Sequence, residues 1–186
     1  MHALIDLLTL QTISVIIAAA SVVIYIVNLF LASRREERNK RITLSNNILQ
    51  SLLSEEGAKR FAELLNTNWI DFNDYQKKYD STVNVDHFAK RYSLIVNLDL
   101  LGYLLRNKLV EPEIIYNSGG FISAWMWVKF KSVIEEYRKI AYGHDAFREF
   151  EYLANEMWRM KKERDPTFLT DQTYFPSDAF EKTFNR

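Results

Sequence analysis

The chain has 186 residues, with 24 Lys or Arg balanced by 24 Asp or Glu, so its formal net charge at pH 7 is zero. This balance argues against nucleic acid as a partner, because domains that bind nucleic acids carry an excess of basic residues. The absence of cysteine excludes disulfides, thiol catalysis and zinc–cysteine sites. With five glycines and three prolines, the composition favours helices over long loops.

A run of 27 residues without a charge, Leu7 to Ser33, dominates the N-terminal part of the chain. The hydrocarbon core of a bilayer is about 30 Å thick and is crossed by about 20 helical residues. A cleaved signal peptide would begin with basic residues and have a shorter apolar core. A buried helix of a water-soluble protein rarely runs this far without a charge. The run therefore predicts one uncleaved transmembrane helix over residues 7–33.

Basic residues follow this run at once, whereas the segment before it contains no Lys or Arg. The cluster consists of Arg34, Arg35, Arg38, Lys40 and Arg41. Basic residues are enriched on the cytoplasmic side of membrane helices, where anionic lipid head groups attract them. We therefore expect a single-pass protein of the cell inner membrane, with its N-terminus outside and residues 34–186 in the cytoplasm. The basic cluster would face the lipid surface.

Small residues within the run predict a contact between membrane helices. Ser14, Ala18 and Ser21 recur at helical spacing, as small residues do where two membrane helices approach closely. The alternative is that these residues face lipid, since Ala and Ser are ordinary in single spans. The run contains no Asp, Glu, Lys or Arg, which argues against an ion or proton path formed by this helix alone.

Residues 34–166 are predicted to form an all-α cytoplasmic domain, a bundle of about five to seven helices. The membrane helix is expected to continue to about Leu53, and Ser54 has the position of an N-cap for the next helix. A short aromatic helix opens at residues 69–72. The strongest pattern spans residues 86–109, where apolar residues cover most of the helix circumference. Such a helix is expected to be surrounded by others.

The remaining helices of this domain are marked by their boundaries. Pro112 favours the start of a short helix that ends at the glycines of residues 118–120. A long helix follows over residues 121–143. Asp145 is predicted to cap the next helix, which Pro166 stops.

The stretch from about Val85 to Ala154 resembles an uncharacterised family of prokaryotic proteins. The resemblance is carried by NLDLLGYLLRNKLVEPEIIY, by VIEEYR at the end of a helix with tryptophans, and by FREFEYLANEM. Members of that family have one N-terminal membrane span and a helical cytoplasmic domain of unknown function. The resemblance implies the same layout here. It assigns no functional residue.

No recognisable site for a metal ion, a cofactor or catalysis occurs in the sequence. His2, His87 and His144 lack the spacing of metal ligands. Neither a phosphate-binding glycine loop nor a nucleophile motif is present. We therefore expect no cofactor and no enzymatic activity.

Asp99 is the ionisable residue that interrupts the most apolar segment, LIVNLDLLGYLL. A buried carboxylate must be paired or hydrogen-bonded, or its pKa rises. Its expected role is an ion pair with another helix, to Arg138, Lys139 or Arg148. The alternative is a functional carboxylate in an unrecognised cleft.

Aromatic residues make up 14% of the chain, a surplus that suggests some of them contact a partner. Trp125 and Trp127 face different ways on one helix, and Trp127 is the candidate for an interface. The C-terminal tail, residues 167–186, is too aromatic for a solvated linker. We expect it to dock on its own domain or on a partner through Phe168, Tyr174, Phe175, Phe180 and Phe184.

These features favour a non-enzymatic, membrane-anchored helical protein that acts as an accessory subunit or scaffold of a membrane complex. Its expected partners are the lipid bilayer and either another protein or further copies of itself. One alternative is a small homo-oligomeric channel or sensor. The other is a membrane-bound enzyme of an unrecognised type.

Overall fold

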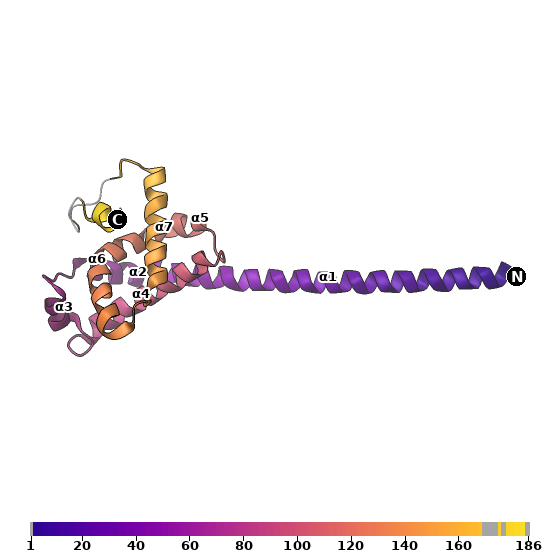
Figure 1. Cartoon of the computed structure of the whole chain (residues 1–186), viewed down its shortest axis with the longest axis horizontal. Helices are drawn as coiled ribbons and strands as arrows, with labels where there is room; N and C mark the ends of the chain where they lie inside the picture. The colour runs from indigo at the N-terminus through magenta and orange to yellow at the C-terminus, as the bar shows by residue number, and fades with distance from the viewer. Residues whose placement is uncertain (1, 169–174, 176–177, 185–186) are drawn as a thin grey trace. The chain divides into compact units, whose positions relative to one another are not determined.

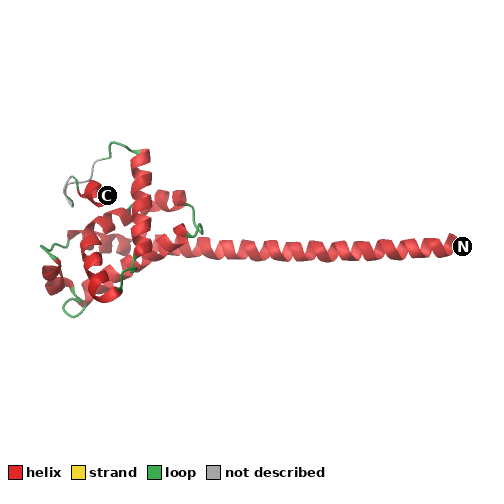
Figure 2. Cartoon of the chain, in the orientation of Figure 1, coloured by secondary structure: helices red, strands yellow, loops and turns green. Residues whose placement is uncertain are grey.

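The computed structural model describes residues 2–168, 175 and 178–184, with side chains described from residue 20 onward. The chain divides into two compact units, Met1–Arg41 and Ile42–Arg186. Throughout the described residues the regular elements are helices, and no strand occurs among them (Figures 1 and 2). This confirms the predicted all-α class.

The first unit is the N-terminal part of helix α1 (His2–Leu53), which is continuous through the predicted span and the basic cluster. Of the predicted span, Leu7 to Ala19 lies outside the residues whose side chains are described. The large apolar side chains between Val22 and Leu31 are exposed. No helix built from the described residues combines the length and the apolar character needed to cross a membrane.

The second unit contains seven α-helices after the end of α1 in the part of the chain that is described. They are α2 (Glu55–Asn66), α3 (Phe72–Tyr79), α4 (Val85–Arg106), α5 (Pro112–Ile115), α6 (Ile122–Tyr137), α7 (Arg148–Arg164) and α8 (Ala179–Phe184). The segment η1 (Tyr116–Gly120) follows α5 and is interrupted by non-helical backbone at Ser118 and Gly119, whereas the π-helical turn η2 (Arg138–Tyr142) extends α6. The bundle agrees with the predicted number of helices.

Local side-chain caps explain where several of these helices begin. Ser54 accepts a hydrogen bond of 3.0 Å from the backbone N–H of Gly57, which confirms the predicted start of α2. Asp71 caps α3 and Asn84 caps α4 in the same way, through the N–H groups of Asp74 and His87. Each cap satisfies one of the N–H groups that a helix start leaves without a partner.

The core of the second unit lies between α4, α6 and α7, with the last turns of α1 packed against it. Fully buried side chains come from all three helices: Leu98 and Leu101 of α4, Phe130 of α6, and Leu153 and Met157 of α7. Burial of one such side chain contributes about 1.5–3 kcal/mol. This core fixes α4 and α7 against each other.

The C-terminal tail is part of this core, although the sequence pattern predicts no helix there and ends the domain at residue 166. Helix α8 packs against α6 and buries Phe180 completely, and Phe175 is buried as well. The tail therefore belongs to the second unit.

Candidate functional site

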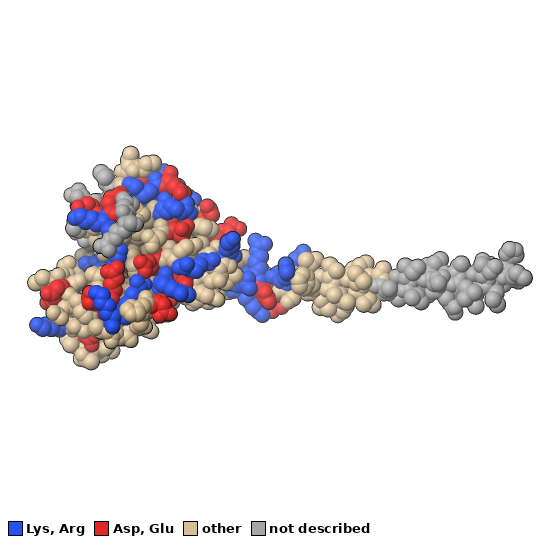
Figure 3. Space-filling view, viewed as in Figure 1, with Lys and Arg blue, Asp and Glu red and all other residues tan. Residues whose placement is uncertain are grey.

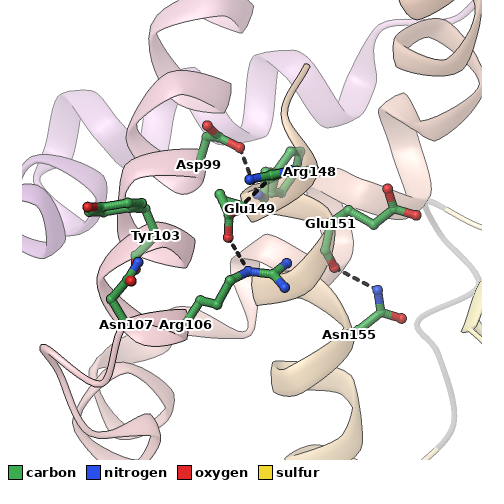
Figure 4. A network of polar contacts seen from close by, with 9 residues as sticks. Asp99, Tyr103, Arg106, Asn107, Arg148, Glu149, Glu151 and Asn155 are labelled. Carbon is green, nitrogen blue, oxygen red and sulfur yellow. Dashed lines mark hydrogen bonds and ion pairs between the residues drawn. The ribbon is translucent and has the colours of Figure 1, made fainter. Parts of the chain in front are cut away.

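Asp99 lies where α4 meets the first turn of α7 (Figure 4). Its Oδ1 atom accepts a hydrogen bond of 2.9 Å from the backbone N–H of Phe150. The side chain is half-buried, and among the described residues it forms no ion pair with Arg138, Lys139 or Arg148. The carboxylate therefore satisfies a helix N-terminus instead of making the predicted ion pair, and its negative charge also suits the positive end of the α7 dipole.

The start of α7 explains why a cap from another helix is needed. The residue before the helix, Phe147, has a φ of 56°, in the left-handed region, and its side chain offers no hydrogen-bond acceptor. Asp145, the predicted cap, lies outside the helix, where its carbonyl accepts a bond of 3.3 Å from the N–H of Arg148. The prediction that Asp145 caps α7 is therefore wrong, and Asp99 does so across the helix interface.

Other carboxylates near this junction form ion pairs with arginines. Glu149 pairs with Arg106 of α4 and with Arg148 at 3.1 Å (Figure 4). Glu151 pairs with Arg138 at 2.9 Å. The network connects α4, η2 and α7, so its role is to hold these elements together.

Burial raises the pKa of Asp99 above its usual value, although the N–H groups of Phe150 and Glu149 partly oppose the shift. An acid with a raised pKa costs stability when ionised, and this cost is relieved as the pH falls through the raised value. We expect Asp99→Leu to lower the free energy of unfolding by about 1–2 kcal/mol, because the N–H of Phe150 loses its acceptor. Asp99→Asn keeps an acceptor and should cost less.

Urea unfolding of both variants between pH 4 and 8 measures these effects. The wild-type protein should gain stability relative to Asp99→Asn as the pH falls. If Asp99→Leu were as stable as the wild type at neutral pH, the capping role would be excluded.

Trp127 is not an interface residue, contrary to the prediction. Its side chain is 1% exposed and lies edge-on to Phe150 of α7. Trp125 has the opposite orientation, is half-buried and contacts Phe175 and Phe180 of the tail. The two tryptophans do face different ways, but both sides of α6 are covered by the same domain.

The rings of the tail also contact the domain itself. Phe168 and Phe184 are half-buried against the core, with Trp158 of α7 at 6.1 and 5.4 Å from their ring centres. Tyr174 lies outside the described residues. Of the two predicted docking modes, the described rings, Phe175 and Phe180 among them, adopt the one on their own domain.

The basic cluster of α1 is exposed, and two of its members are paired along the helix. Lys40 lies 2.6 Å from Glu36 and Arg41 lies 3.6 Å from Glu37. Figure 3 shows these basic side chains beside an uncharged stretch of the same helix. Ser14 and Ala18 lie outside the described side chains, and Ser21 is exposed. The helix contact and the lipid contact therefore remain predictions.

The outer face of α4 is the feature that sequence patterning missed. Tyr92, Val96, Leu100 and Tyr103 are 43, 37, 36 and 50% exposed. Val85 and Ala89 continue the row toward the helix start. The expectation that other helices surround α4 is wrong, because α7, α2 and α3 leave this side uncovered in the described part of the second unit. We call this row of six residues the α4 face.

The spacing of the α4 face has the steps of three and four residues that place side chains on one side of a helix. The sequence contains this signal, but the opposite side of α4 is equally apolar, so the pattern alone did not separate core from surface. Elsewhere in the described chain, no group of three or more His, Asp or Glu is arranged to hold a metal ion. The α4 face is therefore the candidate functional site.

Comparison with known proteins supports a family but no activity. Searches of curated proteins and of solved structures found no significant match. The family model described as a domain of unknown function, DUF4760, matches residues 10–158 and so covers most of α1 and the helices through most of α7. The chain belongs to the DUF4760 family, which confirms the resemblance to an uncharacterised family.

Proposed function

We propose that this protein is a non-enzymatic, membrane-anchored helical scaffold in which two copies associate through the α4 face. The observation that carries the proposal is this row of apolar side chains, left exposed on the longest helix that lies wholly in the second unit. Contiguous exposed apolar side chains on a soluble domain are typical of interaction surfaces.

The membrane anchor is supported by the sequence of residues 7–33 and by the basic cluster that follows it. Because the chain contains no cysteine, single cysteines can be introduced as reporters. We expect a membrane-impermeant thiol reagent to label Ala3→Cys in intact cells and to spare Ser81→Cys. The reverse labelling pattern would overturn the orientation. If both variants were labelled only after the cells are lysed, an N-terminus exposed outside the cell would be excluded.

The sizes of the side chains favour a second copy as the occupant of the α4 face. If two α4 helices pair antiparallel about a point near Leu94, Tyr103 lies opposite Val85, Leu100 opposite Ala89, and Tyr92 opposite Val96. Each contact then combines a larger side chain with a smaller one, which suits helix packing, where the ridges of one helix fit into the grooves of the other. A two-fold axis makes one surface serve both partners.

The charges at the ends of α4 favour the same arrangement. Asp86, which pairs with Lys90 at 2.8 Å, is exposed at the start of the helix, whereas Arg106, which pairs with Glu149, and Lys108 are exposed at its end. Antiparallel pairing brings Asp86 of each copy toward Lys108 of the other, and it also opposes the two helix dipoles. Parallel pairing would bring like charges together.

We expect Val96→Glu to weaken association of the full chain by about 100-fold or more, because it buries two carboxylates near the two-fold axis. Light scattering after size-exclusion chromatography in mild detergent measures the oligomer mass. The matched control is Ile140→Glu, which places the same charge at a site that is 61% exposed and lies outside the α4 face. The control should keep the mass of the wild type.

Two results would contradict the proposal. The first is a wild-type protein that is monomeric at micromolar concentration, and the second is an unchanged mass for Val96→Glu. If Ala18→Ile lowers the mass and Val96→Glu does not, association occurs through the membrane helices, as the alternative of a channel or sensor requires.

A further inference from the structure

A second group of polar side chains is buried between α3, α4 and α6. Arg91 of α4 is 1% exposed, Tyr75 of α3 is fully buried, and His87 of α4 is also buried. No hydrogen bond of normal length joins the three guanidinium nitrogens of Arg91, the hydroxyl of Tyr75 or either ring nitrogen of His87 to a described residue, although Arg91 lies close enough to the Tyr75 hydroxyl to oppose the rise that burial causes in its pKa. Buried polar groups in folded proteins almost always have a partner, so three without one in the same place require an explanation.

These three side chains lie close to one another. His87 and Arg91 are one turn apart on the same side of α4. The guanidinium carbon lies 5.7 Å from the ring centre of Tyr75, which is 6.1 Å from that of His87. Burial lowers the pKa of His87 to about 4, and the charge of Arg91 adds to this shift. Burial raises the pKa of Tyr75 to about 12, and the same charge opposes this shift.

The protein supplies this guanidinium with aromatic rings but with no anion in the described chain. Phe88 and Tyr137 each lie 5.4 Å from it, measured to their ring centres. A cation–π contact contributes about 0.5–2 kcal/mol, whereas burial of an unpaired ion costs several kcal/mol. The rings therefore do not offset the cost of burying this charge.

The acidic side chains of the surrounding helices and turns contact other residues. Asp86 and Glu63 both contact Lys90, at 2.8 and 2.7 Å. Asp80 accepts hydrogen bonds from the backbone N–H of Thr82, at 3.1 Å, and from the hydroxyl of Tyr137, at 2.8 Å, and both lower its pKa. Among the described residues, none of these carboxylates forms an ion pair with Arg91.

We propose that Arg91, His87 and Tyr75 form a buried binding site for a small oxyanion, namely a phosphate or a carboxylate group. The planar guanidinium presents paired N–H donors that match two oxygens of such a group. The hydroxyl of Tyr75 and one N–H of neutral His87 add further donors. The ligand would balance the charge of Arg91 and satisfy all three side chains at once.

Tyr79 marks the route by which an anion enters. Its ring centre lies 4.2 Å from that of His87, with the two ring planes tilted by 30°. The same residue lines a surface hollow together with Lys59 and Thr67. Rotation of this one half-buried side chain would connect the hollow with His87.

The test uses the full chain in detergent, with inorganic phosphate and acetate as probes and sodium chloride at equal ionic strength as the reference. We expect one of the two oxyanions to raise the melting temperature in proportion to the logarithm of its concentration, as binding to the folded state requires. The anion that does so identifies the ligand class. Arg91→Met should abolish the shift, and Arg159→Met, which changes an exposed arginine of α7, should retain it.

Tyr75→Phe provides a second variant that removes one hydroxyl and little else. Calorimetric titration should show about tenfold weaker binding of the same anion, as expected for the loss of one hydrogen bond. The proposal is overturned if neither oxyanion differs from chloride, or if Arg91→Met binds as well as the wild type. If Arg91→Met does not fold, an unchanged affinity of Tyr75→Phe overturns it.

Discussion

We expect Phe180→Ala to lower the free energy of unfolding by about 3–5 kcal/mol, the usual cost of emptying a large aromatic site in a core. Phe180 is fully buried, and its ring centre lies 5.0 Å from that of Trp158 and 6.0 Å from that of Phe121. The substitution therefore removes the aromatic ring that holds α8 against α6 and α7. Urea unfolding followed by tryptophan fluorescence measures the change.

Lys182→Ala is the matched control on the same short helix. Lys182 is exposed and forms a pair with Asp178 at 2.7 Å. Exposed pairs of this kind contribute only about 0.2–1 kcal/mol. Equal losses in the two variants would mean that the tail is a dispensable extension and not part of the core.

The second large effect is expected at Gly102, where α4 crosses α7. A Cβ atom at this position would overlap the carbonyl group of Glu149 and lie 3.2 Å from the Cβ of Leu153. Backbone cannot move aside as a flexible side chain can, so Gly102→Ala must push the two helices apart. Separating the helices would also weaken the hydrogen bond from the Phe150 N–H to Asp99 and the ion pair between Arg106 and Glu149.

We expect Gly102→Ala to destabilise the domain by about 3 kcal/mol, even though alanine favours a helix over glycine by about 1 kcal/mol. Asp86→Ala, which removes an exposed pair with Lys90 on the same helix, should change the stability by less than about 1 kcal/mol. A stability gain for Gly102→Ala would show that α4 and α7 are not in contact at this residue. Both proteins can be compared by thermal unfolding under identical detergent conditions.

The features that the sequence predicted well are local ones. Ser54 caps α2 as predicted, because a cap and the N–H it satisfies are only three residues apart. Gly119, inside η1, and Gly143, directly after η2, have φ angles of 83° and 84°, which few other residues adopt. Such signals lie within one turn of the chain and can be found without the fold.

The features that the sequence did not predict depend on contacts between distant segments. The acceptor for the start of α7 comes from Asp99, 51 residues away from Phe150. The burial of Trp127 and Phe180 depends on α7 and α8 packing against α6, which no local pattern reports. Helix α4 is apolar on two sides, and only the packed structure shows that one of them is exposed.

Arg91 illustrates the same limit for the second site. In the sequence it is one basic residue among many, at a position that periodicity does not distinguish from an exposed one. Its significance comes from burial without a hydrogen-bond partner, which can be recognised only when α3, α4 and α6 are placed together.

The association of two copies through the α4 face is tested most directly by a pair of cysteines in one chain. Val85 and Tyr103 are about 27 Å apart along one α4 helix, at 1.5 Å per residue, so cysteines at these positions cannot join within one copy. In the antiparallel pair each lies opposite the other residue of the second copy. We expect Val85→Cys/Tyr103→Cys to form a disulfide-linked dimer in membranes under mild oxidation, and each single variant to remain unlinked. Efficient linkage of the single variants, or no linkage of the double variant, would contradict this arrangement.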